Sequence, residues 1–163
     1  MNNMDRVNNI INNRRYRDLL GEIKELETER IYCHHGIEHD LDVARIAVLM
    51  AADEGINVQR DIVYAAALIH DIGRKEQYVN GVEHEIASAA IAPTILEECG
   101  YTDDEIDIII AAIINHGNEA VKNEENLTGL IYRADKASRK CYLCKAADTC
   151  HKPEEKRVRR ILY

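Results

Sequence analysis

The chain has 163 residues, 46% of them hydrophobic, and a formal net charge of −8. This length suits one compact domain, and because Trp and Phe are absent the core must be aliphatic with some Tyr. The acidic balance argues against broad, non-specific binding of nucleic acid, which needs a basic surface, and no stretch approaches the roughly 18 continuous apolar residues of a membrane span.

The first 13 residues are polar and rich in Asn, unlike the charged and then apolar start of a signal peptide. The chain has five cysteines, and an odd number fits a reducing compartment better than a disulfide framework. We therefore expect a cytoplasmic protein that does not associate with membranes.

Helical spacing of apolar residues predicts helices along most of the chain. A charged surface helix is expected over 14–27, a largely buried one over 37–54, and a central one over 58–70 that is apolar on all sides. Gly55 is expected to end the second of these helices and Asn57 to cap the third.

The second half continues the helical pattern. A helix is expected over 83–98, with a kink at Pro93. Thr102 and Glu105 form a capping-box pattern before the Ile-rich run 106–114, so we predict a helix there in spite of the β propensity of Ile.

Two more helices complete the prediction, one over 127–139 and a charged, exposed one over 152–162. No repeat or linker is evident. The sequence therefore predicts an all-α fold in a single domain that spans residues 1–163.

Polar residues gather at the predicted helix ends. The pair His70 and Asp71 leaves a buried helix directly, and buried polar groups need partners such as a metal ion. A single His at a helix end is more often a cap or a surface residue, so the prediction depends on the whole set. Since several helix ends can converge, imidazole and carboxylate groups there are typical of a site for divalent transition metals. The candidate metal ligands are His39, His70, Asp71, His84, His116 and Asp135.

The order of these residues resembles that of the HD-domain superfamily of metal-dependent phosphohydrolases. The likeness begins at His39 in HDLDVARIA, continues through HDIGR at 70–74, and ends with ADKASR at 134–139. It covers roughly residues 35–140 and implies a helical bundle whose metal site lies at converging helix ends. Residues 141–163 are left as a Cys-containing segment, called the C-terminal extension below.

The resemblance also implies how the ligands divide between metals. The mononuclear set corresponds to His39, His70, Asp71 and Asp135, and the further ligands of two-metal members correspond to His84 and His116. In ligand order the chain is similar to di-iron hydrolases of diadenosine tetraphosphate and equally to HD-type mixed-valence di-iron oxygenases. The GYP triplet of the cyclic-di-GMP phosphodiesterases is absent, which sets that activity aside.

The expected cofactor is one or two ions of Fe, Mn, Zn, Co or Ni, with the two oxygens of Asp71 bridging a pair. Ions about 3.5–4 Å apart can share a water and turn it into a hydroxide nucleophile near neutral pH. We expect such a metal-bound hydroxide to hydrolyse an ester or anhydride bond in a small, nucleotide-like phosphorylated substrate. Arg74 and Lys75 are candidate catalytic contacts to the phosphate, and Lys136 and Arg139 flank the site, although solvated surface charge explains these four residues equally well.

Two other functions stay open on the same ligands. One is a di-iron oxygenase of a small organic substrate, and the other is a non-catalytic sensor that contains a metal. Hydrolysis is preferred because it is the commoner use of the superfamily. The sensor is disfavoured because all six candidate ligands are present, whereas a site with only a structural role does not need open coordination positions.

His34 and His35 precede the predicted ligand His39. His35 lies four residues before it and could share a helix face, but Gly36 disfavours a continuous helix there. We interpret both histidines as residues of the pocket rim or of the structure.

The C-terminal extension contains the pattern C-x2-C-x5-C-H from Cys141 to His151. Its thiols, Cys141, Cys144 and Cys150, are a candidate second metal site for zinc or an iron–sulfur cluster. Adjacent Cys150 and His151 do not bind one ion comfortably, so a full set needs a remote residue such as Cys33. Reduced, unliganded thiols are the alternative.

Overall fold

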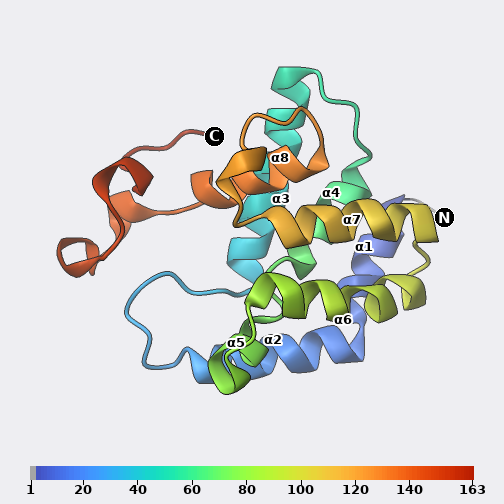
Figure 1. Cartoon of the computed structure of the whole chain (residues 1–163), viewed down its shortest axis with the longest axis horizontal. Helices are drawn as coiled ribbons and strands as arrows, with labels where there is room; N and C mark the ends of the chain where they lie inside the picture. The colour runs from blue at the N-terminus through green and yellow to red at the C-terminus, as the bar shows by residue number, and fades with distance from the viewer. Residues whose placement is uncertain (1–2) are drawn as a thin grey trace.

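The computed structural model describes residues 3–163, in which eight α-helices and no strands occur (Figure 1). The prediction of an all-α fold is confirmed. None of these helices has the length and apolar character that crossing a bilayer requires. The helices are α1 (Asn3–Asn12), α2 (Arg14–Leu26), α3 (Ile37–Glu54), α4 (Arg60–Ile69), α5 (Arg74–Asn80), α6 (His84–Glu98), α7 (Asp103–Asn115) and α8 (Leu127–Ala137).

Helix α4 is the centre of the fold, as predicted, and packs against α1, α3, α7 and α8. Its last five residues, 65–69, are completely buried, because three alanines let neighbouring helices approach closely while Leu68 and Ile69 fill the remaining space. The chain leaves this apolar helix directly into the pair at 70 and 71, so the two polar side chains emerge inside the protein.

The predicted cap of α4 at Asn57 is wrong, since Gln59 occupies the N-cap position. Ile56 and Val58 pack against the core and keep this stretch outside the helix. Gly55 does end α3, with a φ of 69°.

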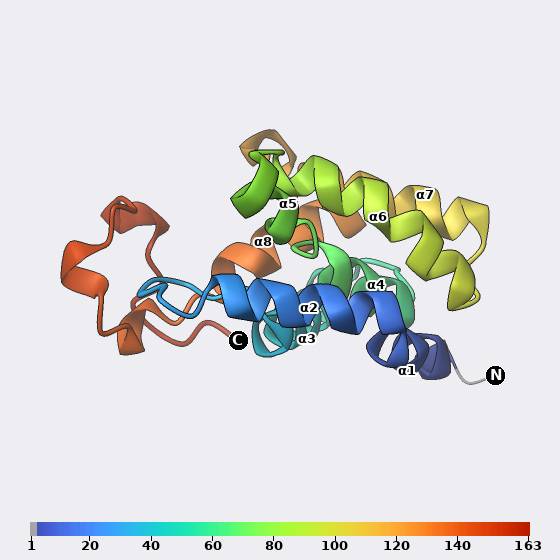
Figure 2. The same ribbon diagram turned by 90° about the horizontal axis from the view of Figure 1, so that it is seen from below.

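Helices α6 and α7 lie side by side as a pair of packed helices (Figures 1 and 2). Helix α6 continues through Pro93. Helix α7 begins with the predicted capping box, in which Glu105 N donates to Thr102 Oγ1 and Thr102 N donates to Glu105 Oε2. Both segments are therefore helices as predicted, and the Ile-rich run is a helix rather than a strand.

Helix α1 was not expected from its polar, Asn-rich sequence. Val7 and Ile10 bury one face of it, and Arg6 reaches two other helices. Its guanidinium donates to Asp61 of α4 at 2.9 Å and to Glu105 of α7 at 2.7 and 3.0 Å. We call these three residues the Arg6 cluster. The cluster ties the first helix to the central one through a fully buried carboxylate.

The predicted last helix over 152–162 is wrong, and helix α8 ends two residues before its predicted limit. The C-terminal extension contains only short 3-10 turns, the last at Glu154–Lys156. Pro153 supplies no amide hydrogen, and the charged residues after it have no apolar stripe to bury against the bundle. The extension, red in Figures 1 and 2, instead runs beside the loop between α2 and α3, where Tyr32 OH donates to Thr149 O at 2.9 Å.

Candidate metal centre

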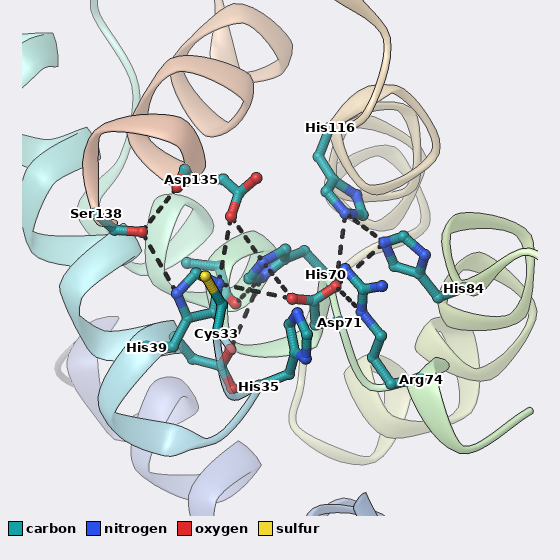
Figure 3. A network of polar contacts seen from close by, with 12 residues as sticks. Cys33, His35, His39, His70, Asp71, Arg74, His84, His116, Asp135 and Ser138 are labelled. Carbon is teal, nitrogen blue, oxygen red and sulfur yellow. Dashed lines mark hydrogen bonds and ion pairs between the residues drawn. The ribbon is translucent and has the colours of Figure 1, made fainter. Parts of the chain in front are cut away.

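The six candidate ligands come from the ends of five helices and from the turn after α4, and the structure brings all of them together (Figure 3). His70 and His116 are the C-cap residues of α4 and α7, His84 is the first residue of α6, and His39 lies in the first turn of α3. Asp135 lies in the last turn of α8. Helix ends therefore supply most of the donors, as the sequence predicted.

The carboxylate of Asp71 lies between two groups of histidines. Its Oδ2 is 3.2 Å from His70 Nε2 and 3.6 Å from His39 Nε2. Its Oδ1 is 3.2 Å from His84 Nε2 and 3.7 Å from His116 Nε2. Each oxygen of one side chain thus faces a different pair of imidazoles, which is the arrangement that a bridging ligand needs.

Asp135 closes the first of these groups. Its Oδ1 is 3.3 Å from His39 Nε2 and 3.8 Å from His70 Nε2. Its Oδ2 accepts a hydrogen bond from Lys136 Nζ at 2.6 Å, and the same amino group donates to the carbonyl of His116 at 2.9 Å. Lys136 therefore binds Oδ2 of Asp135 on the outer side of the centre, and Oδ1 remains directed toward the histidines.

The imidazole tautomers follow from hydrogen bonds on the outer side of the centre. Nδ1 of His70 lies 2.6 Å from Ala67 O, and Nδ1 of His116 lies 2.6 Å from Ile113 O. A carbonyl oxygen only accepts, so both Nδ1 atoms carry the hydrogen and both Nε2 lone pairs face inward. The buried Nε2 atoms of His39 and His70 make no hydrogen bond within residues 3–163. Ligating histidines are oriented in the same way in metal sites.

The charges of the centre also suit a cation. Burial raises the pKa of both carboxyls, but the surrounding cationic groups outweigh it and hold the pKa of Asp71 and of Asp135 well below the usual range. Burial and Arg74 lower the pKa of His84 to about 3. Burial also lowers the pKa of His39, but Asp135 and Asp71 outweigh it and raise the pKa to about 10. Two ionised carboxylates and buried, unpartnered imidazole nitrogens fit divalent transition metals, which have to displace the His39 proton on binding.

Gly73 sets the distance between the turn after α4 and helix α6. Its amide donates to Ser88 Oγ at 2.9 Å. A Cβ at this position would lie 2.5 Å from His84 O and 2.5 Å from Ser88 N, which backbone atoms cannot tolerate. The glycine therefore allows the contact that places His84 beside Asp71.

The two candidate catalytic cations lie in different places. Arg74 Nε donates to Asp71 Oδ1 at 2.9 Å, Arg74 Nη1 donates to Gln77, and Arg74 lines the cavity above the centre. Lys75 instead pairs with Glu22 of α2 and is not part of the cavity wall. The structure therefore brings only Arg74 to the centre.

The predicted cysteine site is not assembled in the described part of the chain. Cys141, Cys144 and Cys150 are free thiols that line the same cavity, as does Cys33. No group of three close metal donors includes any of them. Cys141 and Cys144 lie at either side of one 3-10 turn, and Cys150 follows the next turn.

Glu27, His35 and Tyr78 form a unit at the rim of the cavity, which Glu27 and His35 line. Glu27 Oε2 accepts from the amide of His35 at 2.8 Å, and Oε1 accepts from Tyr78 OH at 2.6 Å and lies 2.5 Å from His35 Nδ1. Burial raises the pKa of Glu27, but His35 and Tyr78 outweigh it and lower the pKa to about 2. Because Nδ1 is engaged, Nε2 is the free nitrogen of a side chain that lines the cavity. His35 was expected at the pocket rim, whereas nothing in the sequence indicated its partners Glu27 and Tyr78.

Comparisons with known proteins agree with this architecture. The family model described as HD domain matches residues 36–151, so the chain belongs to the HD domain family. An uncharacterized protein of Clostridium beijerinckii is 42% identical over 160 residues, which cover 98% of this chain and all of that one. Ribonuclease Y of Rubrobacter xylanophilus is 32% identical over 104 residues, 63% of this chain but only 18% of that enzyme.

A solved structure confirms the fold. It is described as a predicted HD superfamily hydrolase from an uncultured Thermotogales bacterium, and it aligns with a TM-score of 0.60 at 23% identity, covering 86% of this chain and 80% of the other. The chain therefore has a hydrolase-like HD fold with a His/Asp cluster that could hold metal ions.

Proposed function

We propose that this protein is a metal-dependent phosphohydrolase that acts on an ester or anhydride bond of a small, nucleotide-like substrate. The observation that carries the proposal is the carboxylate of Asp71, whose two oxygens each face a separate pair of inward-pointing Nε2 atoms. In the proposed arrangement His39, His70, Asp71 and Asp135 would hold one ion, and Asp71, His84 and His116 would hold a second.

Bound metals would supply Lewis acidity and an activated water. The overall reaction forms one bond from a water oxygen to phosphorus and breaks the bond from phosphorus to the leaving oxygen, which takes up a proton. The residues around the centre then have to bind and orient the phosphate. Arg74 is fixed by Asp71 and Gln77 and lines the cavity, so its remaining N–H groups can donate to a phosphate oxygen. Nε2 of His35, on a ring fixed by Glu27, can hydrogen-bond to a second substrate oxygen.

The cavity supports a substrate of nucleotide size. It has a volume of about 910 Å³ and extends from the candidate ligands to the C-terminal extension. Basic side chains line it although the protein as a whole is acidic, which favours an anionic substrate over a neutral one. The similarity to a segment of ribonuclease Y supports the same bond type, since that relative acts on RNA.

The test is a metal analysis followed by an activity panel. Protein loaded with Mn²⁺, Fe²⁺ or Co²⁺ would be assayed with p-nitrophenyl phosphate, bis-p-nitrophenyl phosphate and nucleoside mono-, di- and triphosphates. We expect two ions per chain and release of phosphate or nitrophenol that requires metal. Oxygen uptake by the Fe²⁺-loaded protein without any hydrolysis would replace this proposal with the oxygenase function. Metal binding with neither activity would support a sensor.

A further inference from the structure

One wall of the cavity is formed by the chain that follows α8, from Arg139 through the C-terminal extension to Arg157, and the proposed reaction does not use this wall. Three contacts hold this part of the chain in place. Tyr32 OH donates to Thr149 O, the ring of His151 packs edge-on against Tyr32, and Lys140 pairs with Asp42 of α3 at 2.6 Å. The extension is therefore fixed beside the metal centre rather than projecting freely into solvent.

Two cations on this wall have no carboxylate partner. Arg139 makes one hydrogen bond through its guanidinium, to the backbone carbonyl of Lys156 at 3.0 Å. The amino group of Lys152 makes neither a hydrogen bond nor an ion pair within residues 3–163. Other basic residues of the same wall are neutralised, Lys140 by Asp42 and Arg157 by Glu154.

Arg139 and Lys152 also line the same cavity. Lys152 is half-buried, and burial lowers its pKa. Repulsion from Arg139 and from Lys136 also lowers it, while Cys33 and Cys150 raise it. Lys136, Arg139 and Lys152 all line the one cavity, so their three positive charges share its interior. Like charges that are partly withdrawn from water destabilise each other unless an anion lies between them.

The three positions run from the centre into the extension. Lys136 touches Asp135, a candidate metal ligand, and Arg139 follows one helical turn later, just after the end of α8. Lys152 reaches the same cavity from the extension. An anionic group that touches Arg139 and Lys152 would therefore lie beyond the phosphate held at the centre. Arg and Lys are the residues that bind phosphate groups in proteins, Arg through paired N–H donors and Lys as a point charge.

We propose that Arg139 and Lys152 form a subsite for a second phosphate of the substrate, next to the phosphate that is hydrolysed. The substrate would then carry a phosphate chain, as nucleoside diphosphates and triphosphates do, rather than a single phosphate ester. This inference rests on the proposed function for the position of the first phosphate, and it adds the chemical class of the substrate.

The test compares two substrates on the metal-loaded, full-length protein. Arg139→Gln and Lys152→Gln remove one charge each, and Lys140→Gln is the matched control, because Lys140 lines the same wall but already has a partner. We expect the ratio of kcat/KM for a nucleoside triphosphate to kcat/KM for p-nitrophenyl phosphate to fall about 10-fold in each test variant, mainly through KM, as loss of one charged hydrogen bond predicts. The control should keep the ratio of the unmodified protein. An unchanged ratio in both test variants would overturn the subsite.

A binding measurement separates this inference from the proposed function. Calorimetric titration with tripolyphosphate and with orthophosphate needs no turnover. We expect the affinity for tripolyphosphate to fall about 10-fold in Arg139→Gln and Lys152→Gln while the affinity for orthophosphate stays constant. That result in a protein without hydrolytic activity would keep the subsite and reject the phosphohydrolase. Hydrolysis of p-nitrophenyl phosphate together with equal tripolyphosphate affinity in all variants would support the phosphohydrolase and reject the subsite.

Discussion

Two polar clusters of this protein differ in how far their charged groups pair with one another. In the Arg6 cluster, one guanidinium donates to two carboxylates, so the cation is fully paired, and Asp61 Oδ1 is the one buried atom of the cluster without a hydrogen-bond partner among the described residues. At the metal centre, buried Nε2 atoms of His39 and His70 point inward and have no hydrogen-bond partner among the described residues. Buried polar groups are normally satisfied, so imidazole nitrogens left open around one point indicate a missing ligand, and the metal centre is the open cluster. A cluster whose cation and carboxylates pair with one another, the closed cluster, indicates a structural role.

The largest expected effect is the loss of activity in Asp71→Asn. This change keeps the shape of the side chain but removes the charge that faces both pairs of histidines. We expect kcat/KM for the best phosphate substrate to fall about 10⁴-fold, and bound metal per chain to fall with it. The control is Asp53→Asn at an exposed position of α3. Full activity of the Asp71 variant would remove the basis for a catalytic centre at this position.

A change in the closed cluster should affect stability instead. Arg6→Met leaves the fully buried carboxylate of Asp61 without its partner, and breaking a buried ion pair costs about 3–5 kcal/mol of unfolding free energy. Urea denaturation would measure the loss, and the double variant with Asp61→Asn should recover part of it. Specific activity of the folded protein should be retained. A variant of normal stability and low activity would contradict the structural role of this cluster.

Metal removal tests the open cluster without a mutation. An ion present at 100 times its dissociation constant stabilises the native state by about 2.7 kcal/mol, which corresponds to about 5–11 °C in Tm for a protein of this size. Chelation should therefore lower Tm by that amount for each ion removed, in the unmodified protein and equally in Arg6→Met. Asp71→Asn should show a much smaller shift. Identical melting curves with and without chelator would argue against a metal centre.

The smallest effect concerns Glu27. Its carboxylate is paired with His35 and Tyr78, while the His35 ring also lines the cavity. The pKa of Glu27 is lowered from 4.5 to about 2 in the folded protein, so this carboxylate stabilises the fold above about pH 4.5 and loses this contribution as the pH falls toward 2. The difference in Tm between the unmodified protein and Glu27→Gln should therefore be constant near neutral pH and shrink below pH 4.5. Activity should fall about 10-fold because His35 loses its orientation. Glu25→Gln, an exposed change on the same helix, should show neither effect.

Much of the fold could be predicted because its signals are local. The capping box at Thr102, the stop at Gly55 and the apolar α4 are each encoded within a few residues. The closeness of the six candidate ligands is not a local property, since helix ends that are far apart in the sequence have to meet. The spacing of the ligands alone did not predict that these helix ends meet, and the prediction came from the resemblance to the HD superfamily.

The features that were missed depend on contacts between distant segments. The sequence of helix α1 resembles a polar tail, and its place in the fold depends on the contact of Arg6 with Asp61, 55 residues away. Glu27 lies in a charged stretch, and only the fold shows that it is 3% exposed. The charged C-terminal run looked helical by composition, but it has no surface on the bundle against which to pack.

Gly73 touches no candidate ligand through a side chain, yet one added carbon atom there would collide with the backbone of α6. Helix α6 carries only one of the donors, His84, and that donor belongs to the second proposed ion. Displacement of α6 would leave the first group of ligands intact and open the second. In the proposed two-metal centre the second ion therefore depends on the smallest residue in the turn, and we expect a Gly73→Ala change alone to give a mononuclear form without substitution of any ligand.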